Sequence, residues 1–288
     1  MKNRGILGKK GRILEGSPIT RIIWVVVLVL LMIICLFPFA YMLGMSLIDA
    51  HMLRVDLKTL LSSEFTLDNY IKLFKENDYS LYVKNSIIVT GLGVFLTCFF
   101  GAMAGYAFAK KKFPGVSTIF LVFMALGMVP GTVLLIPRFL VSRSLGLMNT
   151  YVGLFLPTLA GGGIILMHQF LKSLPDTLLE AADIDGCSEL GKFTRIVVPL
   201  IKPVLTTLAI STFTALWGDM LWPLVMVSEN KMTTLTLAVA TLRKKTEGET
   251  RYGEVFAGYV LTMAPTMTVY LFGQKYFIEG ISVSGMKL

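Results

Sequence analysis

Residues 22–41 read IIWVVVLVLLMIICLFPFAY, an apolar run that holds no charged side chain. About 20 such residues let one helix cross the hydrocarbon core of a bilayer. A secretory signal peptide has a shorter apolar core followed by a small-residue cleavage site, and the sequence shows no such site before Asp49. The run therefore predicts a retained membrane-spanning helix.

The composition of the whole chain is that of a membrane protein. Among its 288 residues, 55% are hydrophobic and 16% are charged, whereas a soluble domain carries roughly 25% charged residues. Six spans of about 20 residues each would occupy somewhat under half of such a chain and leave room for loops. We expect a single integral membrane domain over residues 1–288.

The net charge and the cysteines argue against other classes of protein. The formal charge of +9 does not indicate nucleic-acid binding, because basic residues beside apolar spans set topology and meet anionic lipid headgroups. Cys35, Cys98 and Cys187 are scattered along the chain, which favours neither a disulfide framework nor a metal site. His51 and His168 are also far apart in sequence and form no metal-binding motif.

Apolar stretches recur along the chain and predict an all-α bundle of six membrane-spanning helices. The predicted spans cover residues 22–48, 86–109, 117–136, 150–171, 203–227 and 255–273. The second span is rich in small residues, which let neighbouring helices approach closely in a membrane. These small residues are Gly91, Gly93, Gly101, Ala102, Ala104 and Gly105.

Basic residues at two places predict the orientation of the bundle. Lysines and arginines are frequent in residues 1–21, before the first span, and residues 110–112 form a lysine turn after the second. Cytoplasmic loops carry an excess of lysine and arginine. Both segments are therefore expected in the cytoplasm, and an alternating count places residues 172–202 and the tail at 275–288 there as well.

Residues 172–202 interrupt the apolar pattern with five acidic and four basic side chains. Pro175 can begin a helix and Gly186 can end it, and a second helix starting near Ser188 would run until Pro199. The product is a short helix, a glycine bend and another helix at the membrane surface. An ordinary amphipathic interfacial helix also fits these residues.

The corner of this loop has residues suited to a docking site. Ala181, Ala182 and Gly186 are small, so a partner protein can approach the backbone closely. Glu180 and Asp185 can add directed polar contacts. We expect these five positions to be the contact and bend residues of the loop.

The same residues resemble a known signature. Glu180-Ala-Ala-x-x-x-Gly186, followed after nine residues by Ile196-x-Val198-Pro199, is similar to the coupling loop of ABC importer permeases, with Val198 where leucine is usual. Further segments between residues 65 and 280 resemble the carbohydrate branch, specifically the smaller permease of maltose-type importers. They are FTLDNY at 65–70, KNS at 84–86, VPG to IP between 129 and 137, LGLMNTY at 145–151 and QKYFIEG at 274–280.

The resemblance implies a permease subunit of a sugar importer in a bacterial cell membrane, multi-pass and with both termini in the cytoplasm. Such a chain forms half of the translocation path beside a second, related permease. A separate dimer of ATP-binding subunits, seated on the coupling loops, would use ATP and Mg, so this chain would be no enzyme and would bind no cofactor. An extracytoplasmic solute-binding protein would deliver the sugar, and no nucleic acid would take part.

Another segment of the resemblance, ALWGDMLWP at 215–223, lies on the fifth predicted span, and Gly218 stands there where asparagine is usual. From the residues alone, Trp217 and Trp222 suit an aromatic belt at the membrane interface. Asp219 is a costly charge at that depth unless it is paired or wetted. The same three residues are candidates for lining the path of the substrate.

Other functions are open to a chain of this composition. An ion-coupled secondary transporter would need ionisable residues inside its spans, and Asp219 is the candidate here. A membrane-embedded enzyme would need a nucleophile with a base or a metal cluster, and the sequence has no Walker glycine loop, no His-Glu-x-x-His and no Gly-x-Ser-x-Gly. An ABC importer for a non-sugar solute such as a glycerol phosphate is a further alternative.

Overall fold

The computed structural model describes residues 18–48, 60, 63–76, 78–159, 162–246 and 252–285. Every regular element in this part of the chain is helical, which confirms the predicted all-α fold class. Most of the predicted cytoplasmic N-terminus at 1–21, and residues 286–288 of the predicted tail, lie outside the described residues.

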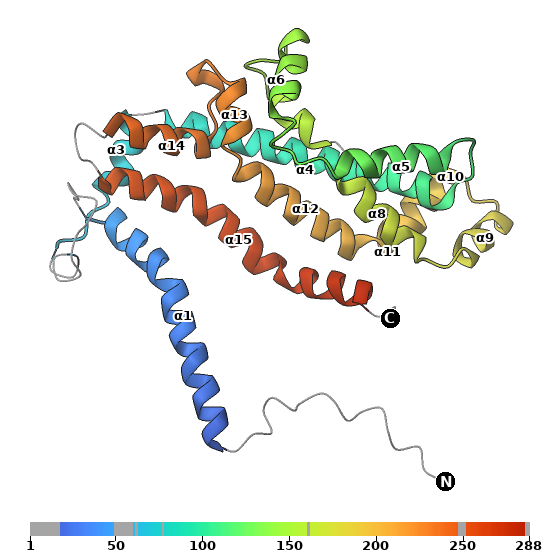
Figure 1. The fold of residues 1–288 in the computed structure, drawn as a ribbon, viewed down its shortest axis with the longest axis horizontal. Helices are drawn as coiled ribbons and strands as arrows, with labels where there is room; N and C mark the ends of the chain where they lie inside the picture. The colour runs from blue at the N-terminus through green and yellow to red at the C-terminus, as the bar shows by residue number, and fades with distance from the viewer. Residues whose placement is uncertain are drawn as a thin grey trace.

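The helices follow one another along the chain as Figure 1 labels them. They are α1 (Pro18–Ser46), α3 (Asp68–Glu76), α4 (Tyr79–Lys110), α5 (Val116–Gly127), α6 (Leu135–Ser144), α7 (Tyr151–Phe155), the 3-10 helix η1 (Leu156–Leu159), α8 (Gly162–Lys172), α9 (Thr177–Ile184), α10 (Glu189–Gly191), the π-helix η2 (Lys192–Val197), α11 (Val198–Leu200), α12 (Lys202–Trp217), α13 (Leu221–Met226), the 3-10 helix η3 (Asn230–Met232), α14 (Leu235–Thr246) and α15 (Tyr252–Gly285).

Among the described residues, three helices are each long and apolar enough to cross a membrane, namely Ile19–Ser46, Tyr79–Lys110 and Tyr252–Gln274. They correspond to the first, second and sixth predicted spans. A fourth candidate is the pair Glu189–Leu200 and Lys202–Trp217, which is bent by 76°. The predicted spans at 117–136 and 150–171 are each divided into shorter helices, so six crossings of the membrane stay a prediction.

The bundle is centred on α4, which packs against α8, α12 and α14. Small residues on α4 explain how closely α8 approaches, because the buried Gly101 and Gly105 face Gly163 and Met167 of α8. A Cβ atom added at Gly105 would lie 2.5 Å from the Cβ of Met167. Gly91 on the same helix is exposed, and a Cβ added there meets nothing within 4 Å.

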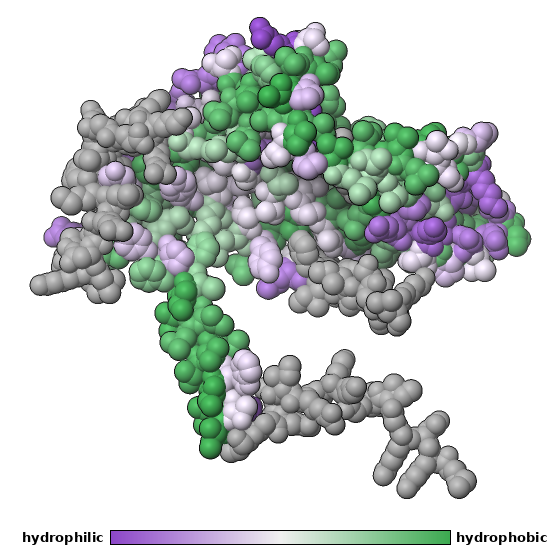
Figure 2. Space-filling model, viewed as in Figure 1, coloured by the Kyte–Doolittle hydropathy of each residue, from purple (hydrophilic) through white to green (hydrophobic). Residues whose placement is uncertain are grey.

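For most of its length α1 stands apart from the other helices (Figure 1). Its large apolar side chains from Ile19 to Phe39 are exposed, and Figure 2 shows the helix as a hydrophobic column. Near its C-terminal end it packs on α15, and Met45, Ile48 and Leu60 form a buried cluster there with Tyr252 and Phe256 packed against it. An apolar surface of this length requires lipid or another membrane protein around it.

The FTLDNY segment supplies the cap and the anchor of α3. The Thr66 hydroxyl accepts a hydrogen bond from the Asp68 N–H at 3.1 Å, as is typical of a side chain that caps the start of a helix. The buried Asn69 amide donates to the carbonyls of Ser46 and Ile48 at 2.9 and 2.7 Å. The end of α1 is thereby tied to α3.

The KNS and LGLMNTY segments meet at the end of the bundle that carries α14. Asn85 donates to the carbonyls of Lys231 and Thr233 at 2.9 Å each, and its Oδ1 accepts from the Tyr151 hydroxyl at 2.8 Å. Asn149 accepts hydrogen bonds from two backbone N–H groups of the same loop. The side-chain amides of Asn85 and Asn149 thus satisfy hydrogen-bonding groups of the backbone between α13 and α14 that water would otherwise satisfy.

The contact between α4 and α8 generates a prediction about stability. Gly105→Ala should destabilise the protein by about 1–3 kcal/mol, because the added methyl group overpacks the contact with Met167. Gly91→Ala is the matched control, since its methyl group enters open space. The midpoint of thermal unfolding in detergent micelles measures both effects. Equal midpoints for the two variants would contradict this account of the packing.

Candidate functional site

The loop predicted at 172–202 folds as a helix, a bend and a second helical segment. After α9 the chain turns at Gly186, whose φ is +70°, a conformation that favours glycine. The Gly186 N–H donates to the Asp183 carbonyl at 3.0 Å, and the Cys187 N–H donates to the Ala182 carbonyl at 2.9 Å. Such bonds are typical of a helix that a glycine terminates.

The segment after the bend is capped at its start and irregular at its end. The Ser188 hydroxyl accepts from the Gly191 N–H at 3.2 Å and so caps α10. The π-helix η2 follows directly, and such turns are rare and frequent at functional sites. The helical path then bends by 76° into α12. The loop is therefore a distinct unit at one end of the bundle (Figure 1).

The corner of the loop presents apolar and small residues outward. Ile184 is 88% exposed and Leu190 is 69% exposed, although Figure 2 shows hydrophilic surface gathered at this end of the molecule. Ala182 is 6% exposed, so its methyl group packs within the chain. The other predicted contact residues are exposed, and they are Glu180, Ala181, Asp185 and Gly186.

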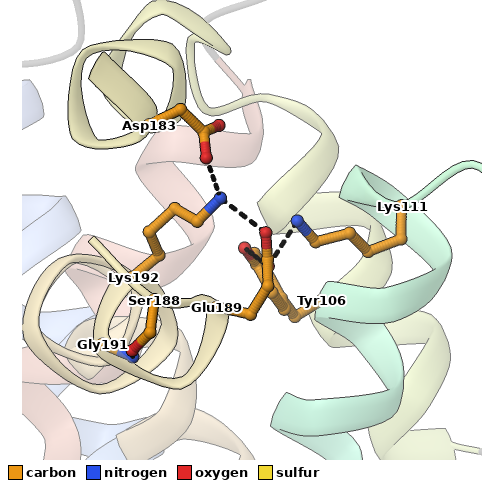
Figure 3. Close-up of polar contacts among 7 residues, drawn as sticks. All are labelled: Tyr106, Lys111, Asp183, Ser188, Glu189, Gly191 and Lys192. Carbon is orange, nitrogen blue, oxygen red and sulfur yellow. Dashed lines mark hydrogen bonds and ion pairs between the residues drawn. The ribbon is translucent and has the colours of Figure 1, made fainter. Parts of the chain in front are cut away.

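A group of ion pairs joins α9, the segment after the bend and the end of α4 (Figure 3). The Lys192 Nζ lies 2.5 Å from a carboxylate oxygen of Asp183 and 2.5 Å from one of Glu189. Glu189 also pairs with Lys111, and it accepts a hydrogen bond from the Tyr106 hydroxyl at 3.4 Å. Because the Lys192 side chain is only 2% exposed, its ammonium group depends on these carboxylates.

A second lysine holds the start of α9. The Lys110 Nζ lies 2.6 Å from Asp176 Oδ1 and 2.6 Å from the carbonyl oxygen of Leu174. The hydrogen bond from Lys110 lowers the pKa of Asp176. The lysine turn at 110–112, which suggested a cytoplasmic position from sequence, thus also holds the loop in place.

The pairing keeps the members of the network charged. The hydrogen bond from Lys111, followed by that from Lys192, lowers the pKa of Glu189 to about 2. The hydrogen bonds to Asp183 and then to Glu189 raise the pKa of Lys192. Since both shifts favour the charged forms, these attractions persist throughout the physiological pH range.

The five acidic residues of the loop divide into two groups. Asp176, Asp183 and Glu189 are each paired with a lysine of this chain. Within the described part of the chain, no ion pair involves Glu180 or Asp185. The loop thus uses three carboxylates for its own structure and leaves two exposed at the corner, where a partner can reach them.

The three residues suggested for the substrate path have different surroundings. Trp217 is 5% exposed and donates through Nε1 to the Thr262 carbonyl at 2.8 Å. Trp222 is 7% exposed and donates to the Gly153 carbonyl at 2.9 Å. The aromatic-belt interpretation therefore fits neither indole. Asp219 accepts from the Trp222 N–H at 3.2 Å, so this carboxylate caps α13.

Asp219 and Trp222 also line a cavity of about 380 Å³. Its walls come from α6 and the turn before it, η1 and α13, and Trp217 is not among the lining residues. Thr132 and Arg138 add polar groups to a lining that is otherwise largely apolar. An apolar cavity with a few convergent polar groups is the usual form of a small-molecule site.

Sequence reasoning missed the lysine network and the exposure of Ile184. The spacing of Glu189 and Lys192 by three residues is a signal for an ion pair on a helix. The pairing of Lys111 with Glu189 gives no local signal, because the two residues are distant in sequence. In the described part of the chain, no group of three or more His, Cys, Asp or Glu side chains is arranged to hold a metal ion.

Comparisons with known proteins place these features in a family. Residues 98–283 match the family described as binding-protein-dependent transport system inner membrane component. The chain is 33% identical over 283 residues to the arabinooligosaccharides transport system permease protein AraQ of Bacillus subtilis, covering 95% of this chain and 99% of that protein. It is 29% identical to the trehalose/maltose transport system permease protein MalG of Thermococcus litoralis, covering 93% of this chain and 97% of that protein.

A solved structure has a similar fold. One chain of a bacterial ABC transporter involved in the import of the acidic polysaccharide alginate superimposes with a TM-score of 0.76 at 24% identity, covering 91% of this chain and 99% of that one. The family match spans more than half of the sequence and includes the loop with Gly186. The chain therefore belongs to the family of inner membrane components of binding-protein-dependent transport systems.

Proposed function

We propose that this chain is one permease subunit of an ATP-driven sugar importer in a bacterial cell membrane, with both termini in the cytoplasm. The observation that carries the proposal is the corner at Ile184 and Gly186, which is exposed and is backed by ion pairs. Relatives named as permeases of arabinooligosaccharide and trehalose/maltose transport support a sugar as the substrate. The family is one of transport components, so the chain is not an enzyme.

The corner is suited to enter a groove on a separate ATPase. Burial of an isoleucine side chain yields roughly 1.5–3 kcal/mol, and Ile184 is the most exposed apolar side chain of the loop. Gly186 has no side chain to obstruct close approach, and Glu180 and Asp185 can pair with basic groups of the partner. ATP and Mg would be bound by that ATPase and not by this chain.

Transport then follows from movement of the loop. ATP binding closes a dimer of ATPases, which brings the coupling loops of this chain and of a second permease together. The two bundles rock from an inward-facing to an outward-facing state, a rigid-body switch driven by differences in binding free energy. Lipid and the second permease cover the exposed face of α1, and a solute-binding protein delivers sugar to the outer face.

The cavity at Asp219 is the best candidate for a contact with sugar in transit. It contains a carboxylate, the guanidinium group of Arg138 and the hydroxyl group of Thr132. Such groups form hydrogen bonds with sugar hydroxyls. Trp222 contributes an aromatic wall, whereas Trp217 is buried elsewhere in the bundle.

Replacement of Ile184 tests the docking role. Ile184→Asp should weaken ATPase binding by about 2 kcal/mol or more, as for a central interface residue, because it places a charge in an apolar contact. Co-purification of the ATPase with the permease pair measures the loss. Phe65→Asp is the control, since Phe65 is also exposed, at 69%, but stands just before α3, and Figure 1 shows α3 at the end of the bundle opposite α9. Full ATPase recovery with Ile184→Asp would remove the docking role.

Two substitutions at Gly186 distinguish its role in the bend of the loop from its role in the close approach of a partner. Gly186→Val opposes the positive φ, whereas Gly186→Asn tolerates it better. Both add a side chain where this chain has no atom within 4 Å, so both should reduce ATPase co-purification and sugar uptake, with valine having the larger effect. Unchanged assembly and uptake in both variants would show that no partner approaches this corner.

Asp219→Asn tests the path. The amide oxygen can still accept the Trp222 N–H, so the cap of α13 is retained while the charge is lost. Hydrogen bonds to a charged group contribute about 1.5–3 kcal/mol, so the KM for uptake should rise roughly tenfold. Uptake kinetics in proteoliposomes would measure the change. A wild-type KM would exclude contact between this carboxylate and the sugar.

A further inference from the structure

The coupling loop has an attachment to the bundle besides its covalent ends. The chain itself joins the loop to α8 on one side and to α12 on the other. Two ion pairs add further links. The pair of Lys110 with Asp176 holds the start of α9, before the bend, and the pair of Glu189 with Lys111, the residue directly after α4, is the link after the bend. Figure 3 shows that Tyr106, on α4, and Lys111, directly after α4, both reach Glu189.

The covalent ends transmit a displacement of the loop poorly. On the α12 side, the π-helix is followed by a bend of 76°. On the α8 side, non-helical residues including Pro175 precede α9. A break in a helix absorbs changes of φ and ψ, whereas a continuous helix moves as a rigid body.

The helix α4 is well placed to receive the displacement. It is 32 residues long and packs against α8, α12 and α14. Near its far end, Asn85 holds the loop between α13 and α14 by hydrogen bonds at 2.9 Å. A displacement of the coupling loop at Glu189, just after the Gly186 bend, would therefore be transmitted through α4 to the core of the bundle and to its opposite end.

Several donors converge on Glu189 and make the link stiffer than a single surface ion pair. An isolated exposed pair contributes little, and the Lys111 and Glu189 side chains are 36% and 59% exposed. Glu189 however also binds Lys192, whose side chain is buried, and the Tyr106 hydroxyl. Groups that share a network reinforce one another.

We infer that Glu189 is a positioning residue that ties the coupling loop to α4 through Lys111, and that this pair sets how much sugar is moved per ATP hydrolysed. The inference rests on the proposed function, because it presupposes an ATPase on the loop. Glu189 is not one of the proposed docking residues, and its role begins once the ATPase is bound. Loss of the pair should leave the ATPase bound and uncouple hydrolysis from transport.

The test uses the complete importer in proteoliposomes with Glu189→Gln, Lys111→Met and the double variant. Lys112→Met is the matched control, because Lys112 is the exposed neighbour in the same turn, and Lys111→Arg preserves the charge. Three quantities are measured: ATPase co-purification, the rate of ATP hydrolysis, and uptake of whichever of arabinotriose, maltose or trehalose the wild type carries best. The first quantity reports docking, and the ratio of the other two reports coupling.

We expect wild-type co-purification in all variants and a fall of about fivefold or more in uptake per ATP for Glu189→Gln and Lys111→Met. The double variant should be no worse than Glu189→Gln alone, because Lys111→Met removes a pair that Glu189→Gln has already removed. Lys111→Arg and Lys112→Met should keep at least most of the wild-type ratio. This pattern would establish the link between the loop and α4.

Three results would overturn the inference. An unchanged ratio in an intact complex would show that the pair transmits nothing, and losses that add in the double variant would show that the residues act separately. Loss of the ATPase from the Glu189→Gln complex would make Glu189 a docking contact, which would support the proposed function while removing the positioning role. A separate result, full co-purification of the ATPase with the Ile184→Asp variant, would contradict the proposed function itself.

Discussion

Hydrocarbon offers no hydrogen-bonding partner to an open backbone, so a chain in a membrane has to satisfy its own polar groups. This constraint accounts for the helical architecture and for the devices found where helices are interrupted. Thr150 caps α7, Asp219 caps α13, and Asn85 and Asn149 bind the backbone that follows α13. Interrupted helices in the membrane region are therefore compatible with the fold, and one such interruption borders the cavity at Asp219.

The loop at 172–202 combines a fixed position with an accessible surface, because ion pairs hold α9 while Ile184 is exposed. Lysines with nearly buried side chains reach carboxylates at the protein surface, and this arrangement fixes α9 without using its exposed corner. The corner then leaves Ile184, Gly186 and two unpaired acids exposed. Under the proposed function, the partner that binds this corner is the ATPase.

Much of the fold follows from the sequence because apolar length and glycine position are local signals. The first, second and sixth spans and the turn at Gly186 were predicted from such signals. The division of the segments at 117–136 and 150–171 was not, since hydrophobicity indicates burial in lipid and not helix continuity. Contacts such as those of Asn85 with the carbonyls of Lys231 and Thr233 join segments far apart in sequence and depend on tertiary geometry.

The candidate site was predicted in part for the same reason. The motif at Glu180 and Gly186 marks the corner, but helical phase decides that Ala181 is exposed and Ala182 buried. An isoleucine in an apolar pattern suggests a core residue, so the exposure of Ile184 becomes visible only in three dimensions. The contact of Lys111 with Glu189 joins segments that share no local pattern.

Photo-crosslinking from position 184 tests the central claim most directly. A photoreactive amino acid in place of Ile184, in the assembled importer, should form an adduct with the ATPase subunit that mass spectrometry identifies. The same amino acid in place of Phe65 should not form this adduct. Phe65 stands just before α3 and Ile184 ends α9, and these helices lie at opposite ends of the bundle (Figure 1). Adducts from position 184 with lipid alone, or with a solute-binding protein, would contradict the account.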